Sequence, residues 1–125
     1  MPSEREEVDT LAVVRLIRRT RLDLSSEKRL QEDLAAALER SQIQYEREKR
    51  LTAADIPDFF LQGGLVIECK MRGKARNLDV YQQLNRYAKH DAVTVIILAT
   101  NLSIGLPASL CGKPVHIASL SAGWI

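Results

Sequence analysis

The chain has 125 residues, which is enough for one hydrophobic core but too few for two domains. Hydrophobic residues make up 46% and charged residues 27%, as in ordinary globular proteins, and a net charge of +2 does not by itself indicate a nucleic-acid partner. No run approaches the roughly 18 apolar residues of a membrane-spanning helix, and the acidic first residues do not resemble a signal peptide. We therefore expect one domain, residues 1–125, with no membrane partner.

The two cysteines, Cys69 and Cys111, lack the spacing of a zinc site. We expect both thiols to be reduced and the protein to be cytoplasmic, since structural disulfides are rare in that compartment.

Two helices are predicted at the start of the chain. Residues 4–21 carry acidic side chains first and arginines last, as the helix macrodipole favours, and they belong to an N-terminal extension over residues 1–24. Residues 27–41 follow capping residues and place four apolar side chains at helical spacing: Leu30, Leu34, Ala37 and Leu38. We expect this second helix to open a core over residues 25–100.

The following residues alternate between strand and helix patterns. We predict strands over 43–51, 56–61 and 65–71, a basic loop over 71–76, and a helix from a cap at Asn77 to about Lys89. An unbroken apolar run over 93–99 is typical of a central strand buried on both faces. One helical turn over 106–110 and a last strand over 115–120 complete the expected order.

Two short motifs carry the chemistry of the chain, Ile56-Pro57-Asp58 and Glu68-Cys69-Lys70. Two converging carboxylates bind a hard cation such as Mg²⁺. Lys70 lies two residues from Glu68 and so on the same strand face, where it could hold an attacking water or a scissile phosphate. The alternative is a structural ion pair between Lys70 and one of the two carboxylates near a strand end.

This pair of motifs resembles the signature of the PD-(D/E)XK nuclease superfamily. Gln83 and Tyr87, one turn apart on the predicted helix, resemble the Q-x-x-x-Y motif of its exonuclease-like and virus-type replication-repair branches. The resemblance covers residues 25–100. It implies an α/β fold with a restriction-endonuclease-like αβββαβ core, a mixed sheet flanked by helices, here with an extra N-terminal helix. It also implies Mg²⁺, with Mn²⁺ as a substitute, held by Asp58, Glu68 and the backbone carbonyl of Cys69.

The superfamily also carries an acidic residue on its first core helix. Glu27 lies roughly 20° from Leu34 around the helix axis and so within the apolar stripe, whereas Glu32 lies roughly 160° away and faces solvent. We favour Glu27, with Gln31 one turn further along the same face. An acid that only interacts with the helix macrodipole remains the alternative.

The resemblance implies metal-dependent hydrolysis of DNA phosphodiester bonds in replication, repair or recombination intermediates. Its site residues would be Asp58, Glu68, Lys70, Glu27, Gln83 and Tyr87. The basic loop residues Arg72, Lys74 and Arg76 either neutralise backbone phosphates or form an ordinary solvated loop. Two other functions stay open: a Holliday-junction resolvase that acts as a homodimer, and a DNA-binding or assembly module that does not cleave.

The length of the turn after the first motif decides whether a metal site can form. A two-residue turn would pair Gln62 with Leu65 and direct Asp58 away from Glu68. A three-residue loop pairs Leu61 with Leu65 and places Asp58 opposite Glu68, and glycine supplies the positive φ that such loops need. The metal site therefore requires the three-residue loop, or a bulge near Asp58.

Overall fold

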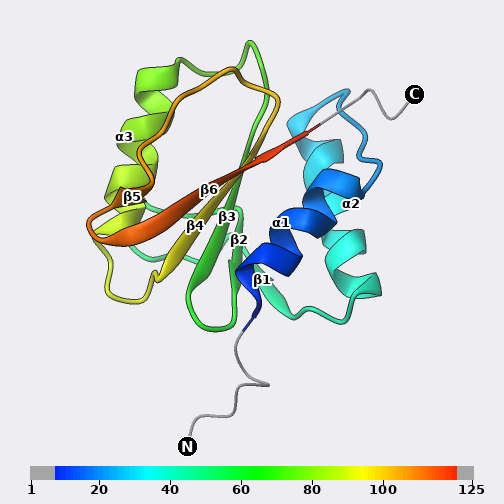
Figure 1. The fold of residues 1–125 in the computed structure, drawn as a ribbon, viewed down its shortest axis with the longest axis horizontal. Coiled ribbons are helices and arrows are strands. Elements are labelled where there is room, and N and C mark those ends of the chain that lie inside the picture. Colours follow the sequence, from blue (N-terminus) through cyan, green and yellow to red (C-terminus); the bar gives the residue numbers. More distant parts are fainter. Residues whose placement is uncertain (1–7, 121–125) are drawn as a thin grey trace, which may run out of the picture.

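A six-stranded mixed sheet lies between two helical layers in the structure, a computed structural model that describes residues 8–120 (Figure 1). One face is covered by α3 (Asn77–Ala88), and the other by α1 (Thr10–Arg19) and α2 (Glu27–Arg40). The strands are β1 (Tyr45–Arg47), β2 (Phe59–Leu61), β3 (Leu65–Lys70), β4 (Val95–Thr100), β5 (Ser109–Leu110) and β6 (Lys113–Ser119). The expected α/β class, with a mixed sheet flanked by helices, is confirmed.

The sheet has the order β1-β2-β3-β4-β6-β5. Pairing is antiparallel from β1 to β3, parallel from β3 through β4 to β6, and antiparallel again between β6 and β5. From α2 to β4 the elements run helix, three strands, helix, strand, and α1 precedes them as an additional helix.

Strand β3 contributes to two separate hydrophobic cores because its side chains alternate between the faces of the sheet. Leu65, Ile67 and Cys69 pack with α1 and α2, whereas Val66 packs with α3. The stripe predicted for the second helix, Leu30, Leu34, Ala37 and Leu38, is buried in the first of these cores. Glu68 and Lys70 continue the Val66 side of the strand and therefore lie on the face that α3 covers.

The hairpin between β2 and β3 has the register that the metal site requires. Leu61 pairs with Leu65 and Phe59 with Ile67, so the three-residue loop is confirmed and the register, when continued, places Asp58 opposite Glu68. Gly63 and Gly64 have φ values of 87° and 91°, which only glycine adopts without strain. A Cβ on Gly64 would also lie 2.3 Å from the carbonyl oxygen of Ala92, so this turn packs tightly against the segment that leads into β4.

Several helices and strands begin or end at other residues than the sequence predicts. Helix α1 begins at Thr10 because Asp9 caps it, accepting hydrogen bonds from the N–H groups of Leu11 and Ala12; the predicted residues 4–7 lie outside the described range. The predicted strand over 43–51 is reduced to β1, because Glu48 has a φ of 52° and leaves the sheet.

The second strand is also shorter than expected, because Pro57 has no N–H for a strand ladder. Asn77 does not cap α3: the cap position is Arg76, and the Asn77 amide instead donates to the carbonyl of Ser103.

The helical turn expected over 106–110 is absent from the described chain, and a hairpin takes its place. Strand β5 pairs with β6 through Ser109–Pro114 and Leu110–Lys113, joined by Cys111 and Gly112 at positive φ. Two positive-φ residues are typical of the tight turns whose twist matches that of a hairpin. No helix in the described range is long and apolar enough to cross a membrane.

Candidate active site

The side chain of Glu68 lies at the centre of the predicted site and is only 3% exposed. Its Oε1 accepts hydrogen bonds from the backbone N–H of Asp58 and from the hydroxyl of Tyr87, both at 3.2 Å. Its Oε2 lies 3.4 Å from the Nζ of Lys70. One buried carboxylate therefore joins both short motifs to the helix that carries the Gln-x-x-x-Tyr pair.

The carboxylate of Asp58 lies against the backbone of the same strand. Its Oδ2 accepts a 2.8 Å hydrogen bond from the N–H of Cys69, which lies beyond the last residue of β3 that pairs with β2. The N–H and carbonyl of one strand residue point toward the same side of the strand. The carbonyl of Cys69 therefore lies on the Asp58 side, as a third oxygen ligand would.

Helix α2 brings an acid to the end of β3. Ser26 caps the helix by accepting a hydrogen bond from the N–H of Arg29, and Glu27 in the first turn accepts one from the N–H of Met71 at 3.3 Å. Glu32 is exposed, and Gln31 accepts a hydrogen bond from Arg47 instead. Of the three candidates on this helix, Glu27 is the one bonded to the strand end that carries Lys70.

Gln83 and Tyr87 are linked along α3. The Gln83 side-chain amide donates to the Tyr87 hydroxyl at 2.9 Å, and this hydroxyl donates in turn to Glu68. Tyr87 has no exposed surface, because its ring packs in the core between α3 and the sheet. The helix thus places one oriented hydroxyl on the carboxylate of the Glu-X-Lys motif.

Burial gives the two carboxylates unusual proton affinities. Burial raises the pKa of Asp58 to about 6. Burial, together with the negative charge of Asp58, raises the pKa of Glu68 to about 8. The positive charge of Lys70 partly opposes both shifts. Burial beside Glu68 also raises the pKa of the Tyr87 hydroxyl, which therefore stays a hydrogen-bond donor. Such shifts mark a site that lacks positive charge.

These shifts predict a pH dependence of stability in metal-free buffer. The folded protein keeps protons that the unfolded chain releases near the ordinary pKa values of 3.8 and 4.5, so stability is greatest below about pH 4 and decreases until about pH 8. At about 1.4 kcal/mol per pKa unit the loss is several kcal/mol, so we expect the Tm to fall by at least about 10 °C between pH 5 and pH 8.

Scanning calorimetry in buffers with a chelator measures this dependence. Glu68→Gln should remove most of it, because glutamine has no proton to lose. A Tm that rises over the same interval in the unmodified protein would contradict the assignment of raised pKa values.

A second prediction concerns the Tyr87 hydroxyl. Tyr87→Phe leaves the Gln83 amide without its partner and removes one of the two hydrogen bonds to Oε1 of Glu68, and we expect a loss of about 1–3 kcal/mol in the free energy of unfolding. Tyr81→Phe on the same helix is the matched control, because Tyr81 is 38% exposed, and its effect should stay within about 0.5 kcal/mol. Urea denaturation measures both; equal effects would mean that the Tyr87 hydroxyl bond contributes no stability.

The donor set fits a hard cation bound by few side chains. In the described part of the chain no three His, Cys, Asp or Glu side chains converge as a complete metal site would. The buried Glu68 and the partly buried Asp58 nevertheless lie close enough that the charge of Asp58 raises the pKa of Glu68, and the carbonyl of Cys69 lies on the Asp58 side. A magnesium ion commonly takes one or two carboxylates and completes its shell with water and substrate phosphates.

The basic residues of the predicted loop lie next to this site. Arg72, Lys74 and Arg76 are all exposed; the Arg72 N–H donates to the side chain of Asn101, and Arg76 forms an ion pair with Asp79 on α3. Their exposure suits either phosphate contact or simple solvation.

Arg47 is a residue that the sequence analysis missed. Its guanidinium donates to Gln31 at 2.7 Å and lies 4.7 Å from the centre of the Phe59 ring. It is also close enough to oppose the pKa shift that burial imposes on Asp58. A basic residue on the face of β1 that points to the second helix is a weak sequence signal, because its two partners, Gln31 and Phe59, lie far from it in the chain.

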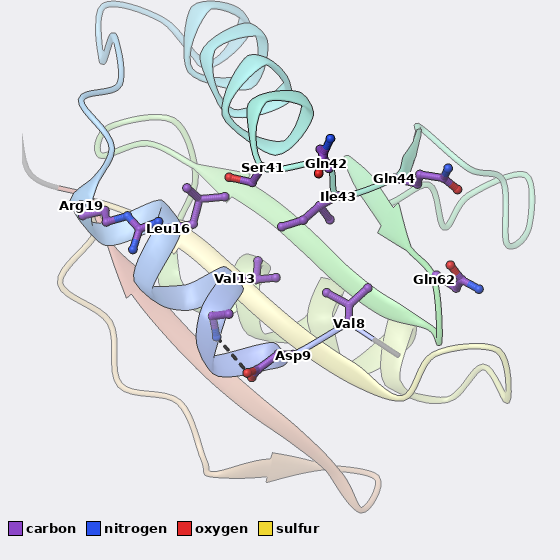
Figure 2. Close-up of a pocket in the computed structure, with 11 residues that line it drawn as sticks. Val8, Asp9, Val13, Leu16, Arg19, Ser41, Gln42, Ile43, Gln44 and Gln62 are labelled. Carbon is purple, nitrogen blue, oxygen red and sulfur yellow. Dashed lines mark hydrogen bonds between the residues drawn. The ribbon is translucent and has the colours of Figure 1, made fainter. Parts of the chain in front are cut away.

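A pocket of the described chain lies away from this site. It has a volume of about 560 Å³ and lies between α1 and the segments around Ile43 and Gln62, as Figure 2 shows. None of its eleven lining residues belongs to the carboxylate cluster, by which we mean Asp58 and Glu68 with their hydrogen-bond partners.

Comparison of the chain with protein-family models, with curated proteins and with solved structures gave no match.

Proposed function

We propose that this protein is a metal-dependent nuclease of the PD-(D/E)XK type that hydrolyses DNA phosphodiester bonds. The observation that carries the proposal is the convergence on the buried side chain of Glu68, which contacts the backbone N–H of Asp58, the amine of Lys70 and the hydroxyl of Tyr87. Gln83 joins this group through its hydrogen bond to Tyr87. A structural ion pair would need only Glu68 and Lys70. It would not account for the raised pKa values of two neighbouring carboxylates.

The arrangement assigns a role to each residue. Asp58, Glu68 and the carbonyl of Cys69 would hold Mg²⁺, or Mn²⁺ in its place, which when bound supplies charge neutralisation and an acidic water. Lys70 would orient that water or stabilise the charge that develops on the phosphate. Glu27 would act through a water at the end of β3. Tyr87, itself fixed by Gln83, would keep the Glu68 carboxylate turned toward Lys70.

The order of elements from α2 to β4 supports the restriction-endonuclease-like core, since helix, three strands, helix and strand is the order which that core requires. The exposed cations of the loop after β3, together with Arg47, would neutralise phosphates on both sides of the carboxylates.

The test is cleavage of DNA of defined shape. The pure protein is incubated with single-stranded, nicked, flapped and four-way DNA, with Mg²⁺, with Mn²⁺ and with a chelator, and products are separated by denaturing electrophoresis. We expect metal-dependent products from at least one substrate. Preference for four-way DNA by a dimer would favour the junction resolvase, and binding without any product would favour the non-cleaving module.

A further inference from the structure

Asp55 lies three residues before Asp58 and is attached to the end of α3. Its Oδ1 accepts a hydrogen bond from the Nε of Arg86 at 3.0 Å, and its Oδ2 lies 2.9 Å from the Nε2 of His90. The Asp55 side chain is 11% exposed and that of His90 is 23% exposed, whereas Arg86 is half exposed, so the carboxylate is shielded from water mainly on the His90 side. An ion pair of this kind is stronger than one in solvent.

The backbone of Asp55 closes its own loop. Its carbonyl accepts hydrogen bonds from the N–H groups of Leu51 and Thr52, and its N–H donates to the hydroxyl of Thr52. Residues 51–55 therefore form a compact turn, which the Asp55 side chain fastens to α3. The bond to His90, followed by that to Arg86, holds the pKa of Asp55 below its usual value, so this carboxylate is ionised at neutral pH.

Both ends of this contact lead directly to the carboxylate cluster. On one side, Ile56 and the buried Pro57 connect Asp55 to Asp58, and the fixed φ of proline limits how far that connection can bend. On the other side, Tyr87 follows Arg86 in the chain and donates to Glu68. Asp55 thus joins the strand segment that carries Asp58 to the helix that carries Tyr87.

We propose that Asp55 is a positioning residue: through Arg86 and His90 it fixes the Asp58 segment against α3 and so sets the spacing of the two carboxylates. The effect of Asp55 on Mg²⁺ binding and cleavage rests on the proposed function. Its effect on the position of Asp58 can be measured whether or not the protein is a nuclease. Two amides report it directly, because the N–H of Cys69 is bonded to the Asp58 carboxylate and the N–H of Asp58 to Glu68.

The experiment compares Asp55→Ala with Asp9→Ala by amide hydrogen exchange, followed by NMR at pH 7. Asp9 caps α1, which covers the opposite face of the sheet from α3 (Figure 1), so we expect its loss to lower the Tm without changing the contacts of Asp55. We expect the Cys69 and Asp58 amides to exchange at least tenfold faster in Asp55→Ala, whereas in Asp9→Ala they follow the global stability. Asp55→Asn, which keeps one acceptor oxygen, should give an intermediate exchange rate for both amides. This variant replaces Asp55→Ala in the test if Asp55→Ala does not fold.

Two further measurements connect position to chemistry. Calorimetric Mg²⁺ affinity should fall about tenfold in Asp55→Ala, and kcat should fall more than KM rises, since the loss concerns metal geometry and not DNA contact. Amide exchange equal to that of Asp9→Ala would overturn the positioning role. The unmodified protein could neither bind Mg²⁺ nor cleave DNA while Asp55→Ala still raises the exchange rates of the Cys69 and Asp58 amides. In that case the proposed function fails, but the positioning of Asp58 by Asp55 is supported.

Discussion

Lys70→Ala should abolish DNA cleavage while leaving the protein folded. The Nζ of Lys70 lies 3.4 Å from Oε2 of Glu68 and the side chain is 18% exposed, so water can take the place of the amine when it is removed. In the proposed mechanism Lys70 acts on the attacking water or on the developing charge of the phosphate, so its loss should lower kcat by on the order of 10³-fold or more. Single-turnover cleavage with saturating Mg²⁺ measures this effect, and circular dichroism confirms the fold.

Lys89→Ala provides the matched control, since Lys89 is exposed at the end of α3 and has no place in the proposed mechanism. Its rate should equal that of the unmodified protein. Loss of folding in Lys70→Ala, with Lys89→Ala unaffected, would support the structural ion pair and remove the catalytic role of Lys70.

Asp58→Asn should change metal binding and stability in opposite directions. In the proposed site the substitution removes the negative charge of one metal ligand. We therefore expect the Mg²⁺ affinity measured by calorimetry to fall by more than about tenfold, since even the loss of a residue that only supports a ligand has effects of that size. In metal-free buffer at pH 8 it should raise the Tm, because it removes a buried charge that repels Glu68.

Asp79→Asn makes the same chemical change at a half-exposed position on α3 and should leave Mg²⁺ affinity unchanged. The pKa of Glu68 should also fall in Asp58→Asn, which NMR of labelled side-chain carboxyl carbons can measure. Unchanged Mg²⁺ affinity would exclude Asp58 from the metal site, whatever its effect on Tm.

The regular parts of this fold could be predicted because local patterns and tertiary packing agree. The Leu30-Leu34-Leu38 stripe is fully buried, and the apolar run of β4 is buried between two helical layers, as expected for a central strand. The two glycines and the position of the motifs left a three-residue loop or a bulge near Asp58 as ways to form the site, and the structure has the three-residue loop.

Other parts depended on interactions that no local pattern contains. The sequence pattern of Ile56-Pro57-Asp58 is that of a strand. In the structure, however, the Asp58 N–H donates to the side chain of Glu68 and not to a backbone carbonyl of the neighbouring strand. The apolar residues before Cys111 suited a helical turn equally well, and pairing with β6 decided for a strand.

The candidate site divides in the same way. Asp58, Glu68 and Lys70 were visible because their motif spacing is short. Glu27 could be selected over Glu32 from the helix phase alone, and the structure brings Glu27 to the end of β3. Asp55 and His90 were missed because they lie 35 positions apart and meet only through the packing of α3.

The three-residue loop Gln62-Gly63-Gly64 makes the site sensitive to the length of this loop, which substitutions do not alter. Loss of a single codon there leaves two ways to close the hairpin. A two-residue turn keeps Leu61 opposite Leu65 and so keeps Asp58 opposite Glu68. A loop that still has three residues pairs Phe60 with Leu65 and shifts β2 by one position, which keeps apolar side chains on both faces but moves Asp58 away from Glu68. An in-frame deletion scan of the gene across codons 61–65 would therefore separate folding from metal binding by length alone.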